Sequence, residues 1–149
     1  MKLRSAQLQD IEILFEIRTS VRENYQSREE IASLGITPNS LAKMLQTDCR
    51  AWIAEIETQD IGFSIANATE KTIFGIFVRP EFENQGVGRI LMEAAEAWLC
   101  SYGIEQIWLV TGNNPHLRAY GFYLHTSWEA VGVESEGPFK GEMRFVKKC

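Results

Sequence analysis

A short segment in the second half of the chain has residues suited to binding a phosphate group. It reads Val78-Arg79-Pro80-Glu81-Phe82-Glu83-Asn84-Gln85-Gly86-Val87-Gly88-Arg89. An apolar stretch ends there, a short loop follows, and a helix is predicted to begin inside the glycine pair. The first turn of a helix has backbone N–H groups without internal partners, at the positive end of the helix dipole, and such an end binds phosphate. Glycine at 86 and 88 removes the Cβ atoms that would keep a pyrophosphate away from these donors.

Two glycines in a turn also have a simpler explanation, which is a tight turn without any ligand. The phosphate interpretation is favoured by the strand expected before the loop and the helix expected after it. Other phosphate loops fit less well. A Walker loop requires Gly-Lys followed by Ser or Thr, and the chain has Gly88-Arg89-Ile90. A dinucleotide fingerprint that starts at Gly86 requires a small residue at position 91, where Leu91 stands.

The segments around the loop predict a strand–helix–strand unit. Residues 72–78 are apolar on both faces, as expected of a central strand covered on both sides. The helix runs from Gly86 to about Tyr102, and we expect it to pack on the sheet through Leu91, Ala95 and Trp98. Residues 106–111 form a second apolar strand. A crossover of this length makes the two strands parallel neighbours.

The rest of the chain predicts further strands and helices around the same sheet. Strands are expected at residues 2–7, 50–57, 61–65, 128–133 and 142–148. Helices are expected from Asp10, from Thr37-Pro38 and over residues 115–125, with an exposed helix–loop region from Arg22 to Gly35. The length of 149 residues suits one domain, residues 1–149, of the mixed α/β class.

With these elements in place, the sequence resembles the GNAT superfamily of N-acetyltransferases. The family signature, Gln/Arg-x-x-Gly-x-Gly/Ala, follows a strand that ends in Val-x-Pro. Residues 78–80 and 86–88 match it, whereas Glu83 stands where the family has Gln or Arg. A second family block resembles residues 118–123 followed by Ser127-Trp128, where the family has Gly-Phe, and it places Tyr123 on the family tyrosine.

The resemblance implies a mixed, twisted central sheet with helices on both faces, in which the parallel strands 72–78 and 106–111 splay apart at the site of acetyl-CoA. The cofactor-binding residues that it implies are Phe77, Val78, Arg79, Gln85, Gly86, Val87, Gly88, Arg89, Ile90 and Arg118. The N–H of Val78 would polarise the thioester carbonyl. Tyr123 would be the catalytic acid that protonates the leaving thiolate, although its place beside Phe122 on an apolar helix face also fits a core residue.

An acceptor amine must lose its proton before it can attack. With a pKa near 10.4, only about one alkyl amine molecule in 2,000 is neutral at pH 7. A base or a desolvating pocket is therefore required. Residues 72–78 contain no acidic side chain; Glu23 and Glu55 could act through water, and each could equally be a surface charge. The two histidines, His116 and His125, are expected on helix surfaces, so no base is assigned.

Charge and cysteine content exclude several classes of function. The net charge of −5 disfavours nucleic acid as a partner. Cys49, Cys100 and Cys149 are odd in number and scattered, which predicts reduced thiols rather than a disulfide or a metal site. No stretch is apolar enough for a membrane span or a signal peptide, so a cytoplasmic protein is expected.

These observations predict an acetyltransferase that moves the acetyl group of acetyl-CoA to a primary amine by direct attack. The acceptor would be a small amine or a peptide amine, and the protein a monomer or homodimer. The alternative is a non-catalytic acyl-CoA-binding regulatory module. The missing acidic residue on strand 72–78 favours the alternative, whereas Tyr123 favours the enzyme.

Overall fold

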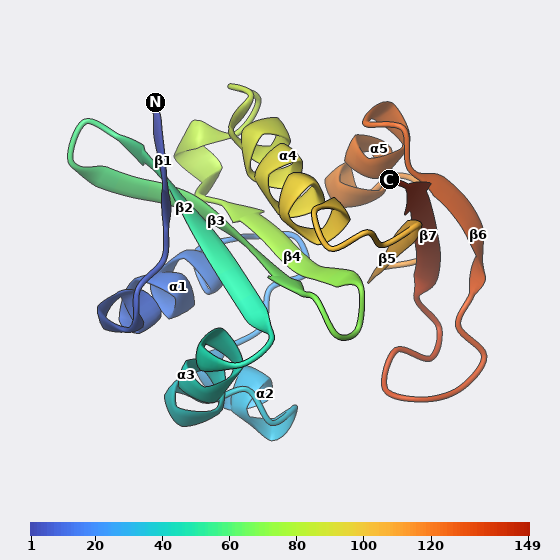
Figure 1. The fold of residues 1–149 in the computed structure, drawn as a ribbon, viewed down its shortest axis with the longest axis horizontal. Helices are drawn as coiled ribbons and strands as arrows, with labels where there is room; N and C mark the ends of the chain where they lie inside the picture. Colours follow the sequence, from blue (N-terminus) through green and yellow to red (C-terminus); the bar gives the residue numbers. More distant parts are fainter.

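The computed structural model describes residues 1–149 and contains one seven-stranded mixed sheet with the order β1-β2-β3-β4-β5-β7-β6 (Figure 1). All neighbouring strands are antiparallel except β4 and β5. The elements are β1 (Lys2–Ser5), α1 (Ile11–Arg18), α2 (Arg28–Ser33), α3 (Pro38–Gln46), β2 (Cys49–Ile56), β3 (Gln59–Asn67), β4 (Thr72–Val78), α4 (Val87–Cys100), β5 (Gln106–Thr111), α5 (Arg118–His125), β6 (Glu129–Val133) and β7 (Met143–Lys148). The predicted mixed α/β architecture is confirmed.

The helices cover both faces of the sheet, as expected. On one face α4 and α5 bury Leu91, Ala95 and Tyr123 in a core with the strands, while Leu14 of α1 and Leu41 of α3 belong to the core on the other face. In Figure 1, α4 crosses in front of the strands and α1 to α3 lie on the opposite side. No helix combines the length and apolar character needed to cross a membrane.

The helix start predicted at Thr37-Pro38 is confirmed. Thr37 caps α3, because its hydroxyl accepts the Ser40 N–H at 3.1 Å and the Ser40 hydroxyl accepts the Thr37 N–H at 2.8 Å. Pro38 follows at the first helical position. The region expected to be exposed helix and loop contains the short helix α2, and the last predicted helix begins at Arg118 rather than at residue 115.

Strand β4 contains an extra residue that separates it from β5. Ile73 pairs with Ala66 and Gly75 with Ile65, so Phe74 has no opposite residue on β3. Such a bulge bends the strand that carries it. The only residue pair between β4 and β5 is Thr72 with Trp108, just before the bulge. The two parallel strands therefore diverge after Thr72, which is the predicted splay.

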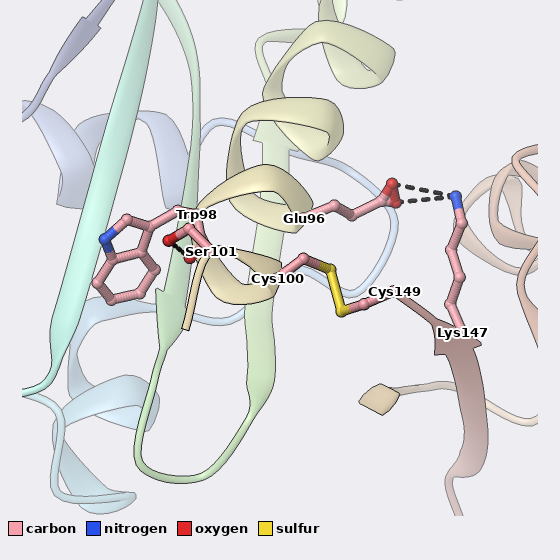
Figure 2. The surroundings of a disulfide bond; sticks show 6 residues. All are labelled: Glu96, Trp98, Cys100, Ser101, Lys147 and Cys149. Carbon is pink, nitrogen blue, oxygen red and sulfur yellow. Dashed lines mark hydrogen bonds and ion pairs between the residues drawn. A yellow bond between two sulfur atoms is a disulfide. The ribbon is translucent and has the colours of Figure 1, made fainter. Parts of the chain in front are cut away.

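Two of the three cysteines form a disulfide, which contradicts the expected reduced thiols. Cys100 at the end of α4 is bonded to Cys149, with 5.4 Å between their Cα atoms (Figure 2). The sequence does not reveal this pair because 49 positions separate the two residues. Pairing of Gln106 with Lys148 brings the end of β7 back to the start of β5, directly after α4. Cys49 remains a free, buried thiol, and burial raises its pKa to about 12.

A polar cluster joins β1 to α1 and the β2–β3 hairpin. The Arg4 guanidinium donates to both carboxylate oxygens of Asp10, at 2.7 and 3.1 Å, and also pairs with Glu55 and Asp60. The Asp10 carboxylate further accepts the N–H of Gln7 at 2.7 Å and is 6% exposed. The hydrogen bond from Arg4 is the main reason that the pKa of Asp10 lies below its usual 3.8.

Replacing Asp10 with asparagine is expected to lower the free energy of unfolding by about 1–3 kcal/mol at pH 7, because buried charge-assisted hydrogen bonds are lost. The pKa of Asp10 is lower in the folded protein than its usual value of 3.8. The contribution of its carboxylate to stability is therefore complete at pH values above 3.8 and is lost as the pH falls through the folded-state pKa. Urea unfolding of both proteins at pH 7 and pH 3 measures the difference. Glu12→Gln, which breaks an exposed pair with Arg28, is the control; an equal loss there would contradict a special role of burial at Asp10.

Candidate active site

The divergence of β4 and β5 leaves backbone groups of β4 without strand partners. The N–H of Arg79 donates to Ile61 O at 2.8 Å, so Arg79 faces β3. Successive residues of a strand direct their N–H groups to opposite sides. The N–H groups of Ile76 and Val78 therefore point away from β3, into the space that β5 has left. An extended ligand could pair with this edge as an additional strand would.

The start of α4 is open and has no side-chain cap. Gly86 occupies the N-cap position with a φ of 83°, a left-handed conformation that favours glycine. No side chain accepts a hydrogen bond from the first N–H groups of the helix. A Cβ atom at Gly86 would meet no atom within 4 Å, so the space outside the first turn is free. Val87 is 2% exposed and anchors this turn in the core. Gly86 and its exposed neighbours Gln85, Arg89 and Ile90 thus fit a phosphate group at the helix end.

Glu83, which departs from the family signature, has a partner. Its carboxylate forms an ion pair with Arg118 at the start of α5, and the same guanidinium donates to Asn84 Oδ1 at 3.3 Å. Arg118 therefore neutralises Glu83 and connects the loop before α4 with α5. Gly88 contributes to the same junction, because a Cβ there would lie 3.5 Å from the Phe122 ring. A direct contact of Arg118 with the cofactor stays a prediction.

The side chains of two predicted cofactor residues lie on the face of the sheet that α1 covers, opposite α4. The Phe77 ring packs against Phe63, with ring centroids 5.2 Å apart, in the core beneath α1. The Arg79 guanidinium donates to Asp60 O at 2.8 Å and lies 3.8 Å from the Glu16 carboxylate of α1. The N–H of Arg79 points to β3, and by the same alternation so does that of Phe77, so neither residue directs its side chain or its N–H into the gap between β4 and β5. A contact of either residue with the cofactor stays a prediction.

Tyr123 is buried among aromatic rings. It is 7% exposed and lies 5.6 Å from Phe145 and 6.3 Å from Trp128, measured between ring centroids. Burial raises its pKa to about 12, so the hydroxyl keeps its proton at neutral pH, as a proton donor must. This hydroxyl makes no hydrogen bond within the protein. The position is compatible with both the catalytic and the core interpretation.

The two candidate bases have different surroundings. Glu55 belongs to the Arg4 cluster at the β1–β2 edge and is held there. Glu23 lies nearer the gap, where its carboxylate accepts the N–H of Arg118 at 2.9 Å. It lines a charged pocket of about 300 Å³ together with Arg22, Pro80, Glu81, Glu83 and Arg118. No sequence signal indicates this pocket, since it joins segments 95 positions apart. His116 and His125 are both exposed, as expected, but only His125 belongs to α5, whereas His116 lies in the turn before that helix.

Comparison with known proteins gives matches over the whole fold. A curated relative, an uncharacterized N-acetyltransferase of Chlorobaculum tepidum, is 35% identical over 74 residues, and the match spans 48% of each chain. The chain thus spans about half the length of this relative. The structure of the PaiA N-acetyltransferase of Thermoplasma acidophilum in complex with coenzyme A has a TM-score of 0.78 at 18% identity, with all of both chains covered.

A second solved structure supports the same fold. An acetyltransferase of the GNAT family from Staphylococcus aureus also has a TM-score of 0.78, at 16% identity, with 99% of this chain and 98% of that chain covered. The model of the acetyltransferase (GNAT) family matches residues 11–126, a range that includes the diverging strands, the uncapped start of α4 and Tyr123. The chain belongs to the acetyltransferase (GNAT) family.

Proposed function

We propose that this protein transfers the acetyl group of acetyl-CoA to a primary amine by direct attack. The observation that carries the proposal is the uncapped, open start of α4 beside the unpaired edge of β4. One feature suits the phosphates of the cofactor and the other suits its extended, amide-containing arm. The structure of the PaiA N-acetyltransferase with coenzyme A supports this choice of cosubstrate by its fold.

Each part of the site has a distinct task in this proposal. The N–H groups of Val87 and Gly88 bind the pyrophosphate, and the N–H of Val78 donates to the acetyl carbonyl and stabilises the charge that develops on its oxygen. Acetyl-CoA supplies an activated acyl group with a thiolate as the leaving group. Tyr123 gives its proton to that sulfur, and the proton that the attacking nitrogen loses restores the Tyr123 hydroxyl. In this proposal the attacking amine approaches from the side of α1, because α4, whose start binds the pyrophosphate, lies on the other side of the sheet.

The non-catalytic alternative, a regulatory module that binds acyl-CoA, is supported by two observations. Strand β4 has no acidic side chain, and Glu55 is held by Arg4. Release of CoA in the presence of primary amines separates the two: a catalyst produces CoA in proportion to the amine, and a binding module does not. The cytoplasmic address and the monomeric or dimeric state stay predictions.

Replacing Gly86 with valine tests the phosphate site. A β-branched residue is strained at a φ of 83°, and its side chain would occupy the open space at the helix start. We expect the affinity for CoA, measured by calorimetry, to fall about tenfold or more.

Gly103→Val provides the matched control. Gly103 has a φ of 78°, and a Cβ atom there would also meet no atom within 4 Å, but this glycine lies beyond the other end of α4. The control should lose stability and keep its affinity for CoA. An affinity of Gly86→Val within about twofold of wild type would contradict the phosphate site.

A further inference from the structure

Arg18, the last residue of α1, carries a positive charge that no acidic side chain neutralises. Its guanidinium lies 4.5 Å from the centroid of the Phe77 ring. Nη2 donates to Asn24 O at 3.1 Å and to Gln26 Oε1 at 2.9 Å. Nη1 is buried and has no hydrogen-bond partner at all. Burial lowers the pKa of Arg18.

Such an arrangement is unusual because the guanidinium is partly buried, and a polar atom that is removed from water requires a hydrogen-bond partner. A buried donor without an acceptor destabilises a protein, and an unpaired charge does so more strongly. Arg28 shows the usual solution in this chain: its guanidinium stacks 4.6 Å over Phe15 and pairs with the Glu12 carboxylate at 2.7 Å. Arg18 has the same aromatic contact but lacks the carboxylate. The chain supplies no carboxylate to Arg18, so an anionic group from outside the chain would provide the missing partner.

The position of Arg18 places this anion on the acceptor side of the site. Phe77 directly precedes Val78, whose N–H faces the gap between β4 and β5. The loop after α1 reaches across that gap, since a Cβ at Gly112, next to the end of β5, would lie 3.7 Å from Asn24 Oδ1. The Arg18 guanidinium is thus enclosed between β4 and this loop, on the face opposite α4. An amine that enters the site from the side of α1 therefore passes the Arg18 guanidinium.

We propose that Arg18 binds a carboxylate of the acceptor, and that the acceptors are small amines carrying a carboxylate, such as free amino acids. This inference rests on the proposed function and names the substrate class. The Nη1 hydrogens donate to the carboxylate, which neutralises the guanidinium and orients the amine toward Val78. Because Nη1 is buried, the carboxylate reaches it only when the loop after α1, which Arg18 contacts at Asn24 O, moves.

The test compares amino acids with their own amides as acceptors of wild-type protein. L-Alanine with L-alaninamide, and L-phenylalanine with L-phenylalaninamide, differ only in the carboxylate, and CoA release gives kcat/KM for each. We expect the acids to be better by about 10- to 100-fold, after correction for the neutral fraction of each amine, as for a hydrogen-bonded charge pair. Arg18→Met should abolish the preference by raising the KM of the acids, and Arg18→Lys should restore part of it.

Arg28→Met is the matched control, because it removes the other stacked guanidinium, which already has a partner. It should keep the preference for acids. Equal kcat/KM for acids and amides in the wild type would overturn the inference and leave the proposed function standing, as would an undiminished preference in Arg18→Met. If no amine of either kind released CoA, the proposed function itself would fail. Calorimetry with CoA verifies that each variant is folded. If Arg18→Met does not fold, the comparison of acids with amides as acceptors of the wild type decides the inference.

Discussion

Replacing Tyr123 with phenylalanine is expected to lower turnover by about 10²- to 10⁴-fold, the usual contribution of a positioned proton donor. The lower end of that range is expected because a thiolate is already a tolerable leaving group. The change keeps the ring between Trp128 and Phe145 and removes only the hydroxyl. Since that hydroxyl has no hydrogen-bond partner in the protein, no buried group loses a bond. CoA affinity and thermal stability should therefore change little while kcat falls.

Tyr120→Phe is the matched control for this experiment. Tyr120 lies on the same helix, is 8% exposed and packs against the same Phe145 ring at 5.0 Å. Its variant should retain turnover. A Tyr123→Phe protein with full activity would remove Tyr123 from the mechanism and assign it to the core, while the CoA site would be unaffected. If wild-type activity were also marginal on every amine, that result would favour the regulatory module.

Replacing Cys149 with serine is expected to lower the free energy of unfolding by about 3–4 kcal/mol under oxidising conditions, from the entropy of the chain that the crosslink closes. The disulfide closes a segment with a sequence separation of 49, which includes β5, α5, β6 and β7. Figure 2 shows that it joins the end of α4 to the end of β7, near the ion pair of Glu96 with Lys147 at 3.0 Å. Urea unfolding of the oxidised proteins measures the loss.

Reduction provides the control for the disulfide. A reductant should destabilise the wild type by the same amount and leave Cys149→Ser unchanged. Lys147→Met, which removes the neighbouring ion pair but retains both cysteines, should cost less and should keep the response to the reductant. A wild-type protein that ignores the reductant would show that the two thiols are not joined in solution.

The parts of the site that the sequence predicted depend on residues close together in the chain. The apolar residues 72–78 and 106–111, with the turn to Gly86 and the periodic helix between them, determine a strand, a helix with an open start and a neighbouring parallel strand. Each is a local preference of the backbone, so it is readable without knowing the rest of the structure. The Thr37-Pro38 helix start was predictable for the same reason.

Contacts between distant segments were decided only by the tertiary structure. The reduced thiols predicted for Cys100 and Cys149 were wrong, because the pairing register of β5 with β7 brings them together. The ion pair of Glu83 with Arg118 also depends on how α5 packs beside α4. The burial of Arg18 Nη1 without a hydrogen-bond partner depends on the tertiary position of the loop after α1. Such features depend on strand register and helix docking, which are determined by many weak contacts along the whole chain. The residues that come into contact in this way therefore share no local sequence pattern.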